Sequence, residues 1–369
     1  MPAEEKDRAL SVHAPAGQVA FAASAEDGDL IRAAGELTRE LNRPRPAIYW
    51  TDAAASAVLG YAALAVAMLA APVWTKLAAG TVSVLSLYRA MSFIHELAHL
   101  KPSAVPGFRT AWNLAVGIPL LIPSFMYEGV HNLHHARTRY GTAEDPEYLP
   151  LARMPPWTLA LFLIASALAP IALLIRYAVL APLSLIVSPL RRPVEECFSA
   201  LAIDPAFRRK PPEGAVRRDW LIWETAASAW AVALLAAAAT GLIPLAAFAV
   251  FLAVVSGVAV LNQIRTLVAH LWQNDGGAIG VTAQYLDSVN VPPPALLPAL
   301  WAPVGLRYHA LHHLLPGLPY HALGEAHRRL SATLPLGSAY HRANYKSLLG
   351  LLARLIAASL HREPPHPYA

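Results

Sequence analysis

The chain has 369 residues, of which 56% are hydrophobic and 14% are charged, with a net charge of +5 and a mean hydropathy of +0.40. Soluble domains carry charge on about 25% of their residues, so this composition indicates an integral membrane protein. The basic residues stand in short clusters beside apolar runs, which is typical of cytoplasmic loops and argues against a nucleic-acid partner. The single cysteine, Cys197, excludes an internal disulfide and an iron–sulfur cluster, which needs about four thiolates.

The first segment, residues 1–46, is polar and carries charges of both signs. Residues 29–41 place leucine, isoleucine and alanine at helical spacing, and Pro44 and Pro46 follow shortly after. Because proline cannot continue a helix, we predict a helix that ends before these residues. We interpret residues 1–46 as a cytoplasmic N-terminal arm.

Two apolar segments follow, at 53–71 and 76–94, with a short turn around Pro72 between them. Each is long enough to cross a bilayer as a helix that rises about 1.5 Å per residue. The turn carries one lysine, whereas several basic residues flank the pair. Because cytoplasmic loops hold the excess of lysine and arginine, the turn is expected outside and the end of the second helix inside.

The next two apolar segments do not fit simple spans. Residues 112–127 contain two prolines and are short, so we expect them to lie along the membrane interface. Residues 157–190 are long but contain a proline and Arg176. A single crossing here would place the seven basic residues between 191 and 218 outside, against the positive-inside bias. We therefore predict that residues 157–190 are interfacial or re-entrant, with no net crossing.

A second spanning pair is predicted at 220–240 and 244–266, joined by an uncharged turn. The last part of the chain is more polar and ends in a basic tail over residues 336–369. The predicted fold is therefore an all-α integral membrane protein with four transmembrane helices in two hairpins plus interfacial helices. Aromatic residues of the spans, such as Tyr88, Phe93 and Trp230, are interpreted as core or lipid contacts.

Eight of the 15 histidines fall in three short motifs, one HxxxH and two HxxHH. Residues i, i+3 and i+4 lie near one another on a helix, so each motif can direct its imidazoles toward one place. The first two motifs precede the second hairpin and the third follows it, so two crossings return the chain to the same side. All three can then meet in one cytoplasmic, histidine-rich, di-metal cap. The motifs are formed by His95 and His99, by His131, His134 and His135, and by His309, His312 and His313.

This number of imidazoles exceeds the needs of one metal ion, since zinc takes about four ligands. Two ions are therefore expected, although imidazole also binds copper, nickel and iron, and nitrogen ligands alone do not choose among them. A metal pair at the mouth of a lipid-embedded helix bundle can reach an acyl chain. Changing an unactivated C–H bond requires a redox metal and oxygen, which zinc cannot supply.

The order of these motifs resembles the membrane fatty acid desaturase family, of the bacterial histidine-box type. HxxxH is followed by HxxHH, a hydrophobic segment and a second HxxHH, and the resemblance covers about residues 50–335. The segments 140–148 and 307–321 around the motifs are similar to those of bacterial members. The resemblance implies a membrane desaturase-like domain over residues 47–335, followed by the basic C-terminal tail.

The resemblance also implies a non-haem di-iron centre held mainly by histidines, with O2 as co-substrate. The family pattern has one more histidine at the cytoplasmic end of the last spanning helix, and His270 matches that place. Thr266 stands where some members have an asparagine that holds a metal through water, so the chain departs from the pattern there. No catalytic residue is predicted beyond the metal ligands. The implied ligands are His95, His99, His131, His134, His135, His270, His309, His312 and His313.

The implied reaction is the O2-dependent desaturation of a membrane lipid or fatty acyl chain. Hydroxylases and ketolases of the same superfamily use the same motifs, and the sequence does not separate these outcomes. No electron-transfer domain is recognisable, so we expect a separate ferredoxin-, rubredoxin- or cytochrome b5-like donor. The expected location is a bacterial inner membrane, with the active site on the cytoplasmic side.

Carboxylates leave other hypotheses open. Glu96 completes an HExxH motif, so an alternative of another class is a membrane zinc metallopeptidase that uses His95, Glu96 and His99. Glu96 and Glu128 also each form Glu-x-x-His, as in carboxylate-bridged di-iron bundles. Both alternatives leave the HxxHH motifs unused. The side chains expected to orient the imidazoles from a second layer are Glu96, Glu128, Asp145, Asp287, Asn290 and His321.

Overall fold

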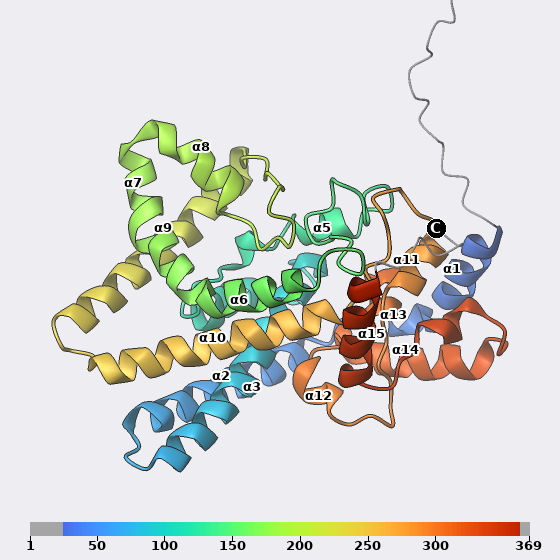
Figure 1. Cartoon of the computed structure of the whole chain (residues 1–369), viewed down its shortest axis with the longest axis horizontal. Helices are drawn as coiled ribbons and strands as arrows, with labels where there is room; N and C mark the ends of the chain where they lie inside the picture. The colour runs from blue at the N-terminus through green and yellow to red at the C-terminus, as the bar shows by residue number, and fades with distance from the viewer. Residues whose placement is uncertain (1–24, 362–369) are drawn as a thin grey trace, which may run out of the picture.

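The computed structural model describes residues 25–361, and in this part of the chain the regular elements are all helices, joined by loops, with no strand. Five of its helices are long and apolar enough to cross a membrane (Figure 1). The predicted all-α, membrane-integral fold is therefore confirmed. The five are α2 (Pro46–Leu69), α3 (Val73–His99), the rod Trp157–Ile186 that contains α6 (Trp157–Ile175) and α7 (Ala181–Ile186), α9 (Gly214–Ala239) and α10 (Leu245–Leu267).

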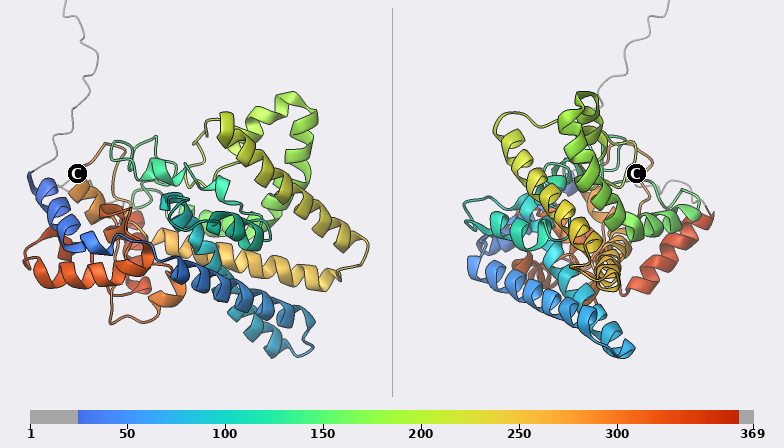
Figure 2. Two further views of the ribbon diagram at one scale, coloured as in Figure 1. Left: turned by 180° about the vertical axis from the view of Figure 1, so that it is seen from behind. Right: turned by 90° about the vertical axis from the view of Figure 1, so that its left-hand side faces the viewer.

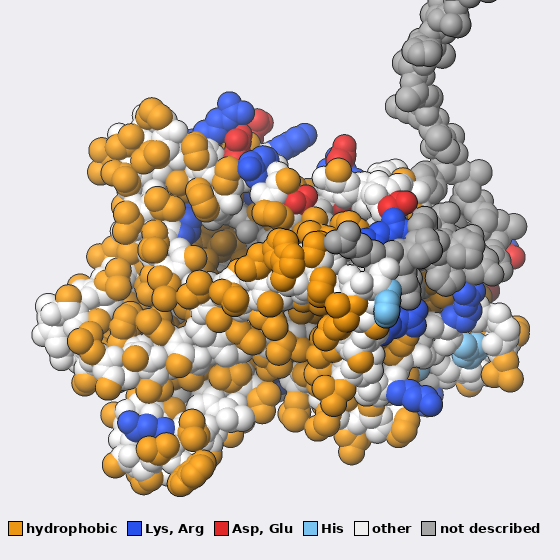
Figure 3. Space-filling view, in the orientation of Figure 1, with side chains coloured by type: hydrophobic (Ala, Val, Ile, Leu, Met, Phe, Trp, Pro, Cys, Tyr) orange, Lys and Arg blue, Asp and Glu red, His pale blue; other side chains and the backbone are white. Residues whose placement is uncertain are grey.

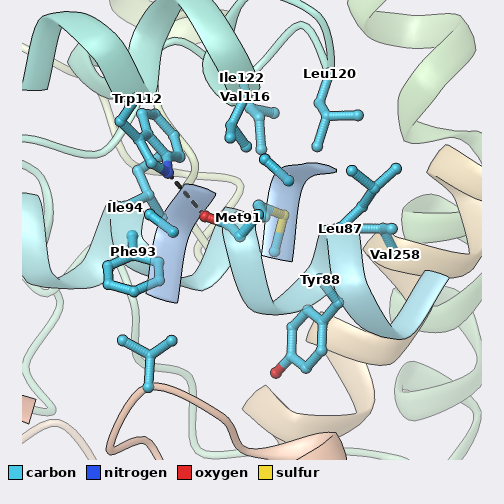
Figure 4. Packing of buried hydrophobic residues seen from close by; sticks show 14 of the residues in the cluster. Leu87, Tyr88, Met91, Phe93, Ile94, Trp112, Val116, Leu120, Ile122 and Val258 are labelled. Atoms are coloured by element: carbon cyan, nitrogen blue, oxygen red, sulfur yellow. Dashed lines mark hydrogen bonds between the residues drawn. The ribbon is translucent and has the colours of Figure 1, made fainter. Parts of the chain in front are cut away.

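Helices α2 and α3 form the first predicted hairpin, and close packing at a glycine holds them together. A Cβ atom at Gly60 would lie 2.6 Å from Cδ2 of Leu87, so only glycine fits at this contact. Next to it, the Ser83 hydroxyl donates a hydrogen bond to the Gly60 carbonyl at 2.9 Å. The same face of α3 continues into the largest apolar core, where the Trp112 indole donates to the Ala90 carbonyl (Figure 4).

Helices α9 and α10 form the second predicted hairpin, and the tips of both hairpins point away from the histidine-bearing end of the molecule (Figure 1). Helix α10 packs on α3, because Gly257 lies against the Val84 side chain; a Cβ there would be 2.8 Å from Cγ2 of Val84. The long helices therefore form one bundle that carries α3 and α10 side by side toward the histidines.

The rod Trp157–Ile186 is the segment that we expected not to cross. It is helical and long enough to span, but it is interrupted by the π-helical turn η4 (Arg176–Leu180), after which α7 rises away from α10 (Figure 1). Helix α8 (Ser188–Cys197) follows, and the chain then returns to the loops around the second histidine motif. There, Leu201 N–H donates to the Met126 carbonyl at 2.9 Å and Ile203 N–H donates to the Pro146 carbonyl at 2.8 Å.

Residues 112–127, expected at the membrane interface, contain only short helices and none of the five long ones. With the loops that follow, they belong to a layer that we call the cap, formed by residues 25–45, 100–156 and 268–361. Its helices are α1 (Ala25–Thr38), η1 (Arg39–Leu41), α4 (Phe108–Trp112), η2 (Asn113–Gly117), η3 (Ser124–Met126), α5 (His131–His134), α11 (Val281–Asp287), α12 (Pro298–Trp301), α13 (His309–Leu314), α14 (Tyr320–Thr333), η5 (Ala339–Ala343) and α15 (Leu348–His361).

Both ends of the described chain pack into the cap, at one end of the long helices (Figure 2). The helix expected at 29–41 is confirmed as α1 and η1, and Leu30 and Ala34 are buried with α13 and α14. In the basic tail, α15 buries Leu351 and Leu355 in the core of the cap. Residues 1–24 of the arm and 362–369 of the tail lie outside the described residues.

Hydrophobic and charged side chains occupy different parts of the surface (Figure 3). Hydrophobic side chains cover much of the viewed face of the long helices. The rod also exposes large apolar side chains, among them Leu168 and Ile171. Lysine and arginine gather mainly along the upper edge and around the cap. Large apolar side chains exposed along the long helices are expected to face lipid, which agrees with a membrane-integral protein.

Candidate metal centre

Three separate elements and one helix end bring the nine predicted histidines together in the cap. His95 and His99 lie on the last turns of α3, which remains helical up to His99. The two HxxHH motifs form the short helices α5 and α13, each only one to two turns long. His270 follows the end of α10 after three residues. The residues arrive from positions far apart in the sequence, as the sequence analysis predicted for a single histidine-rich cap.

The nine imidazoles divide into two clusters, within each of which the candidate ligand atoms lie within 4.8 Å of one another. In the first cluster, Nε2 of His312 lies 3.1 Å from Nε2 of both His99 and His135, and Nε2 of His135 lies 3.0 Å from that of His131. The five members of the first cluster are His95, His99, His131, His135 and His312.

The second cluster contains the remaining four histidines. Nε2 of His270 lies 3.0 Å from Nε2 of His309 and 3.3 Å from that of His134, and Nε2 of His313 lies 3.1 Å from that of His309. The rings of His135 and His313 stack across the boundary, with centroids 4.3 Å apart. The two clusters are therefore adjacent, as a two-ion site requires.

Carboxylates and phenols contact the Nδ1 atoms of several of these imidazoles, on the ring edge opposite the clustered Nε2 atoms. Nδ1 of His134 lies 2.9 Å from a carboxylate oxygen of Asp145, and Nδ1 of His131 lies 3.0 Å from one of Glu147. An imidazole that donates its Nδ1 proton to a carboxylate carries a bare lone pair on Nε2. Nε2 atoms with lone pairs about 3 Å apart repel one another unless a cation lies between them, so the donor set fits metal ions.

Burial keeps these rings in the form that binds a metal. Removal from water, followed by the effect of neighbouring imidazoles, lowers the pKa of His135, His312 and His313 well below the ordinary value. Burial acts in the same direction on His134, but the charge of Asp145 outweighs it and raises the pKa of His134. His95 adds two buried ring nitrogens without any hydrogen-bond partner among the described residues, which also points to a ligand role.

The expected second-layer residues have mixed positions. Asp145 contacts His134 directly, whereas Asp287 acts through Tyr140, whose hydroxyl donates to Asp287 and lies 2.8 Å from Nδ1 of His270. The side-chain oxygen of Asn290 accepts a hydrogen bond from Leu311 N–H and so supports the backbone of α13.

The other three expected residues contact no ligand histidine among the described residues. Glu96 accepts hydrogen bonds from the Tyr49 hydroxyl at 2.6 Å and from Tyr320 N–H at 3.2 Å. Glu128 forms a two-pronged ion pair with Arg109, and Nε2 of His321 accepts from Arg45 N–H. These three side chains brace the cap and are not placed to orient the imidazoles, because each lies on a helix face or loop turned toward another element.

Sequence reasoning missed four residues that contact the site. Glu147 and Tyr127 both contact Nδ1 of His131, Tyr140 contacts Nδ1 of His270, and the Arg265 guanidinium lies 3.0 Å from Nδ1 of His309. A signal for Glu147 was present, since it stands two residues after Asp145 in the same acidic loop. Arg265 was visible as a charge one turn from the end of a hydrophobic span, a position where a charge is costly unless it has a function.

A cavity of about 480 Å³ lies between α3, α6 and α10 and ends at the histidines. Most of its lining is apolar, with side chains such as Ile94, Phe162 and Val258. The aromatic residues interpreted as core behave as expected, since Tyr88 and Phe93 lie inside the apolar core (Figure 4) and Trp230 is partly exposed. The candidate ligand histidines that line the cavity are His95, His131, His134, His270 and His309.

Two adjacent clusters of candidate metal ligands lie beside an apolar cavity between long apolar helices, which defines an integral membrane protein with a candidate di-metal site. The sequence matches the family model described as fatty acid desaturase over residues 70–345, and the chain belongs to this family. The chain is also 47% identical over 352 residues to the ceramide hydroxylase of Caulobacter vibrioides (strain NA1000 / CB15N). That similarity covers 94% of this chain and 100% of the relative, and the predicted family is confirmed.

Proposed function

We propose that this protein is a membrane-bound, O2-dependent hydroxylase of a ceramide-class lipid, with two iron ions held by the nine histidines. The observation that carries the proposal is that imidazoles of both clusters belong to the lining of an apolar cavity between membrane helices. Iron, when bound there, supplies the redox chemistry that an unactivated C–H bond requires. The relative named as a ceramide hydroxylase supports the substrate class and the reaction.

The chain's own residues position the reactants. The apolar side chains of the cavity bind the hydrocarbon part of the lipid and exclude water from the clusters. Asp145, Glu147 and Tyr140 hold the rings of His134, His131 and His270 in fixed orientations through their Nδ1 atoms. In the overall reaction, one oxygen atom of O2 enters a C–H bond of the lipid and the other leaves as water, with two electrons and two protons taken up.

The same site could instead remove two hydrogens and leave a double bond, which is the reaction that the family resemblance implies. Both outcomes use the same ligands, and the relative's name favours hydroxylation. The peptidase alternative is disfavoured by the position of Glu96. A peptidase would need this carboxylate at the metal, but it accepts hydrogen bonds from Tyr49 and Tyr320 on another side of α3.

We also propose four net crossings, with the site on the cytoplasmic side of a bacterial inner membrane. The loops at Met126 and Pro146 are contacted by residues 201 and 203, so the chain returns to the cap after the rod and α8. A segment that leaves the cap at Trp157 and is back at the cap by residue 201 makes no net crossing, and α9 and α10 then return the chain to His270 on the same side. The basic loop residues between 191 and 218 favour the cytoplasm for that side.

The two electrons are proposed to come from a separate ferredoxin-, rubredoxin- or cytochrome b5-like donor. The support is chemical, since hydroxylation consumes two electrons per O2, and the two groups of candidate metal ligands found among the described residues both belong to this one centre. Lysine and arginine around the cap would attract an acidic donor.

One experiment on the purified full-length protein tests the proposal. Metal analysis is expected to find two irons per chain, and incubation with ceramide, O2 and a reducing system is expected to give a product that has gained one oxygen atom. The variant His134→Ala should lose iron and product, whereas His361→Ala, at the exposed end of α15, should keep both. A single zinc ion would contradict the proposal, and a product with two hydrogens fewer would replace hydroxylation by desaturation.

A further inference from the structure

Besides the histidines and the polar residues that contact them, the lining of the apolar cavity includes the polar side chains of Asn262, Gln263 and Ser166. Asn262 and Gln263 belong to the cytoplasmic third of α10, and Ser166 belongs to α6, which packs against it. The residues of α10 that line the cavity include Val255, Val258, Ala259 and Asn262, which lie at helical spacing on one face. The two carboxamides are therefore on the face of α10 that looks into the cavity.

These polar groups are not satisfied by the protein. The Ser166 hydroxyl donates a long hydrogen bond of 3.4 Å to Oε1 of Gln263, but Nε2 of Gln263 is buried without any partner among the described residues. The side chain of Asn262 makes no hydrogen bond to another described residue. A buried amide without a partner costs free energy, most of all in a membrane-embedded helix where leucine or valine would be favourable. A partner from outside the chain would remove this cost.

We propose that Asn262, Gln263 and Ser166 form a hydrogen-bonding subsite for the amide group of an N-acylated lipid, and that this subsite sets which carbon reaches the metal centre. The inference rests on the proposed function and names the group by which the substrate is recognised. A carboxamide offers an N–H donor and a carbonyl acceptor, and a secondary amide offers the same pair in return. An ester offers only acceptors, so it would leave the carbonyl of a carboxamide unpaired.

The position of the subsite on α10 predicts where the lipid is oxidised. Gln263 stands four residues before the end of α10 at Leu267, which is about 6 Å along the helix axis, and His270 follows shortly after. A lipid amide held at Gln263 therefore brings carbons near the amide to the histidines, rather than carbons from the middle of a long chain. The remaining hydrocarbon fills the apolar part of the cavity beside Phe162 and Val258.

The test compares two matched lipids on the iron-loaded full-length enzyme in lipid nanodiscs. One lipid is a ceramide, and the other is its analogue with an ester in place of the amide. Binding is measured without O2 by competition with a fluorescent ceramide, and KM and kcat are measured with O2. The wild-type protein is expected to bind the amide lipid about tenfold more tightly than the ester.

The variants Gln263→Leu and Asn262→Leu keep side-chain size and remove the hydrogen-bonding groups. Each is expected to raise KM for the ceramide about tenfold, with a smaller change in kcat, and to leave ester binding and iron content unchanged. Ser256→Ala is the matched control, because Ser256 also joins α10 to α6, through a hydrogen bond to the Ala167 carbonyl, but does not line the cavity. It should behave as wild type.

The outcomes separate this inference from the proposed function. If the wild-type enzyme binds amide and ester equally, or if an iron-loaded Gln263→Leu variant keeps the amide preference, the subsite is wrong even where ceramide is hydroxylated. If the product carries its oxygen far from the amide, the assignment of position is wrong. If no oxygen is inserted, the proposed function fails, while the binding comparison still decides the subsite.

Discussion

The Asp145 carboxylate lies 2.9 Å from Nδ1 of His134, and two residues further along the same loop Glu147 lies 3.0 Å from Nδ1 of His131. His134 belongs to the second cluster and His131 to the first. One short acidic loop therefore orients an imidazole in each cluster. Asp145 is itself fixed, because its oxygens accept hydrogen bonds from Gly141 N–H and Glu147 N–H. The loop and the two candidate metal ions are expected to stabilise one another.

The variant Asp145→Asn tests this coupling. Loss of the negative charge weakens the orientation and basicity of His134, and changes of this kind lower metal affinity by about 10- to 100-fold. We expect the purified variant to lose iron during dialysis against a chelator, at a chelator concentration at which the wild-type protein keeps its iron. Iron content is measured by elemental analysis.

Glu144→Gln provides the matched control, since Glu144 stands next to Asp145 in the same loop but is exposed and pairs only with Arg139 on the surface. It should retain iron like the wild-type protein. If both variants lost iron equally, the loss would come from a general change in the loop and not from the Asp145–His134 contact.

The gathering of the histidines could be predicted from the sequence because it depends on spacing and on the number of crossings. The division into two clusters could also have been derived in part. Around the helix axis, i+4 is rotated by about 40° from i in one direction and i+3 by about 60° in the other, so the three side chains share a face but i+3 and i+4 flank i on opposite sides. Accordingly, His131 and His135 enter the first cluster and His134 the second, while His309 and His313 enter the second and His312 the first.

Other features depend on contacts between distant segments and leave no local pattern. The phenol of Tyr140 reaches His270 across 130 positions, and Arg265 reaches His309 across 44. For Glu96 the local pattern was present but misleading. The HExxH motif predicts a carboxylate near a metal, whereas the Glu96 carboxylate accepts a hydrogen bond from the Tyr49 hydroxyl. A motif specifies which residues can approach a metal, whereas the packing of other elements decides which of them do.

A buried ion pair holds the rod against α9, and its loss should strongly destabilise the protein. Glu224 accepts from Arg176 at 2.5 Å and from Arg191 at 2.6 Å, and the side chains of Arg176 and Glu224 are each 4% exposed. Glu224→Ala leaves the buried Arg176 without a counter-charge, while Arg191 keeps its ion pair with Glu195, so the free energy of unfolding should fall by about 3–5 kcal/mol. The measurement is denaturant-induced unfolding in detergent micelles.

Glu196→Ala is the control for this prediction, because Glu196 pairs with the 80% exposed Arg192 on the surface of α8. Its stability should equal that of the wild-type protein. If Glu224→Ala were no less stable than Glu196→Ala, the contact between the rod and α9 would not depend on the ion pair.

The contact between α2 and α3 at Gly60 makes a prediction about packing. In Gly60→Ala, the new Cβ would meet Cδ2 of Leu87 at 2.6 Å and the Leu87 backbone nitrogen at 3.1 Å. Forced separation of the two helices should lower the free energy of unfolding by about 1–3 kcal/mol. Since α3 also carries His95 two turns beyond Leu87, the variant should bind iron less tightly.

The matched substitution in the same hairpin is Gly80→Ala, where a Cβ meets no atom within 4 Å. Alanine favours a helix over glycine by up to about 1 kcal/mol, so this variant should be at least as stable as wild type. Equal stability of the two variants in thermal unfolding would refute the tight contact.

His327 predicts a dependence of stability on pH that is separate from the metal ligands. Its Nδ1 lies 2.8 Å from the Tyr340 hydroxyl, and burial, with Arg307 and His341, lowers its pKa from 6.5 to about 4. In the unfolded chain the ring binds a proton below pH 6.5, whereas the folded protein does not until about pH 4. The contribution of the neutral ring is therefore complete above pH 6.5 and falls as the pH drops toward 4.

His327→Gln should remove this part of the pH dependence. The other histidines titrate in both proteins, so the quantity to measure is the difference in free energy of unfolding between wild type and variant, followed from pH 7 to pH 4 on iron-free protein. We expect the wild-type advantage to shrink steadily across this range, because only in the wild-type chain does protonation of His327 stabilise the unfolded state. His361→Gln, at the exposed end of α15, should run parallel to wild type. A His327→Gln curve that also runs parallel would mean that the folded protein accepts the proton as readily as the unfolded chain.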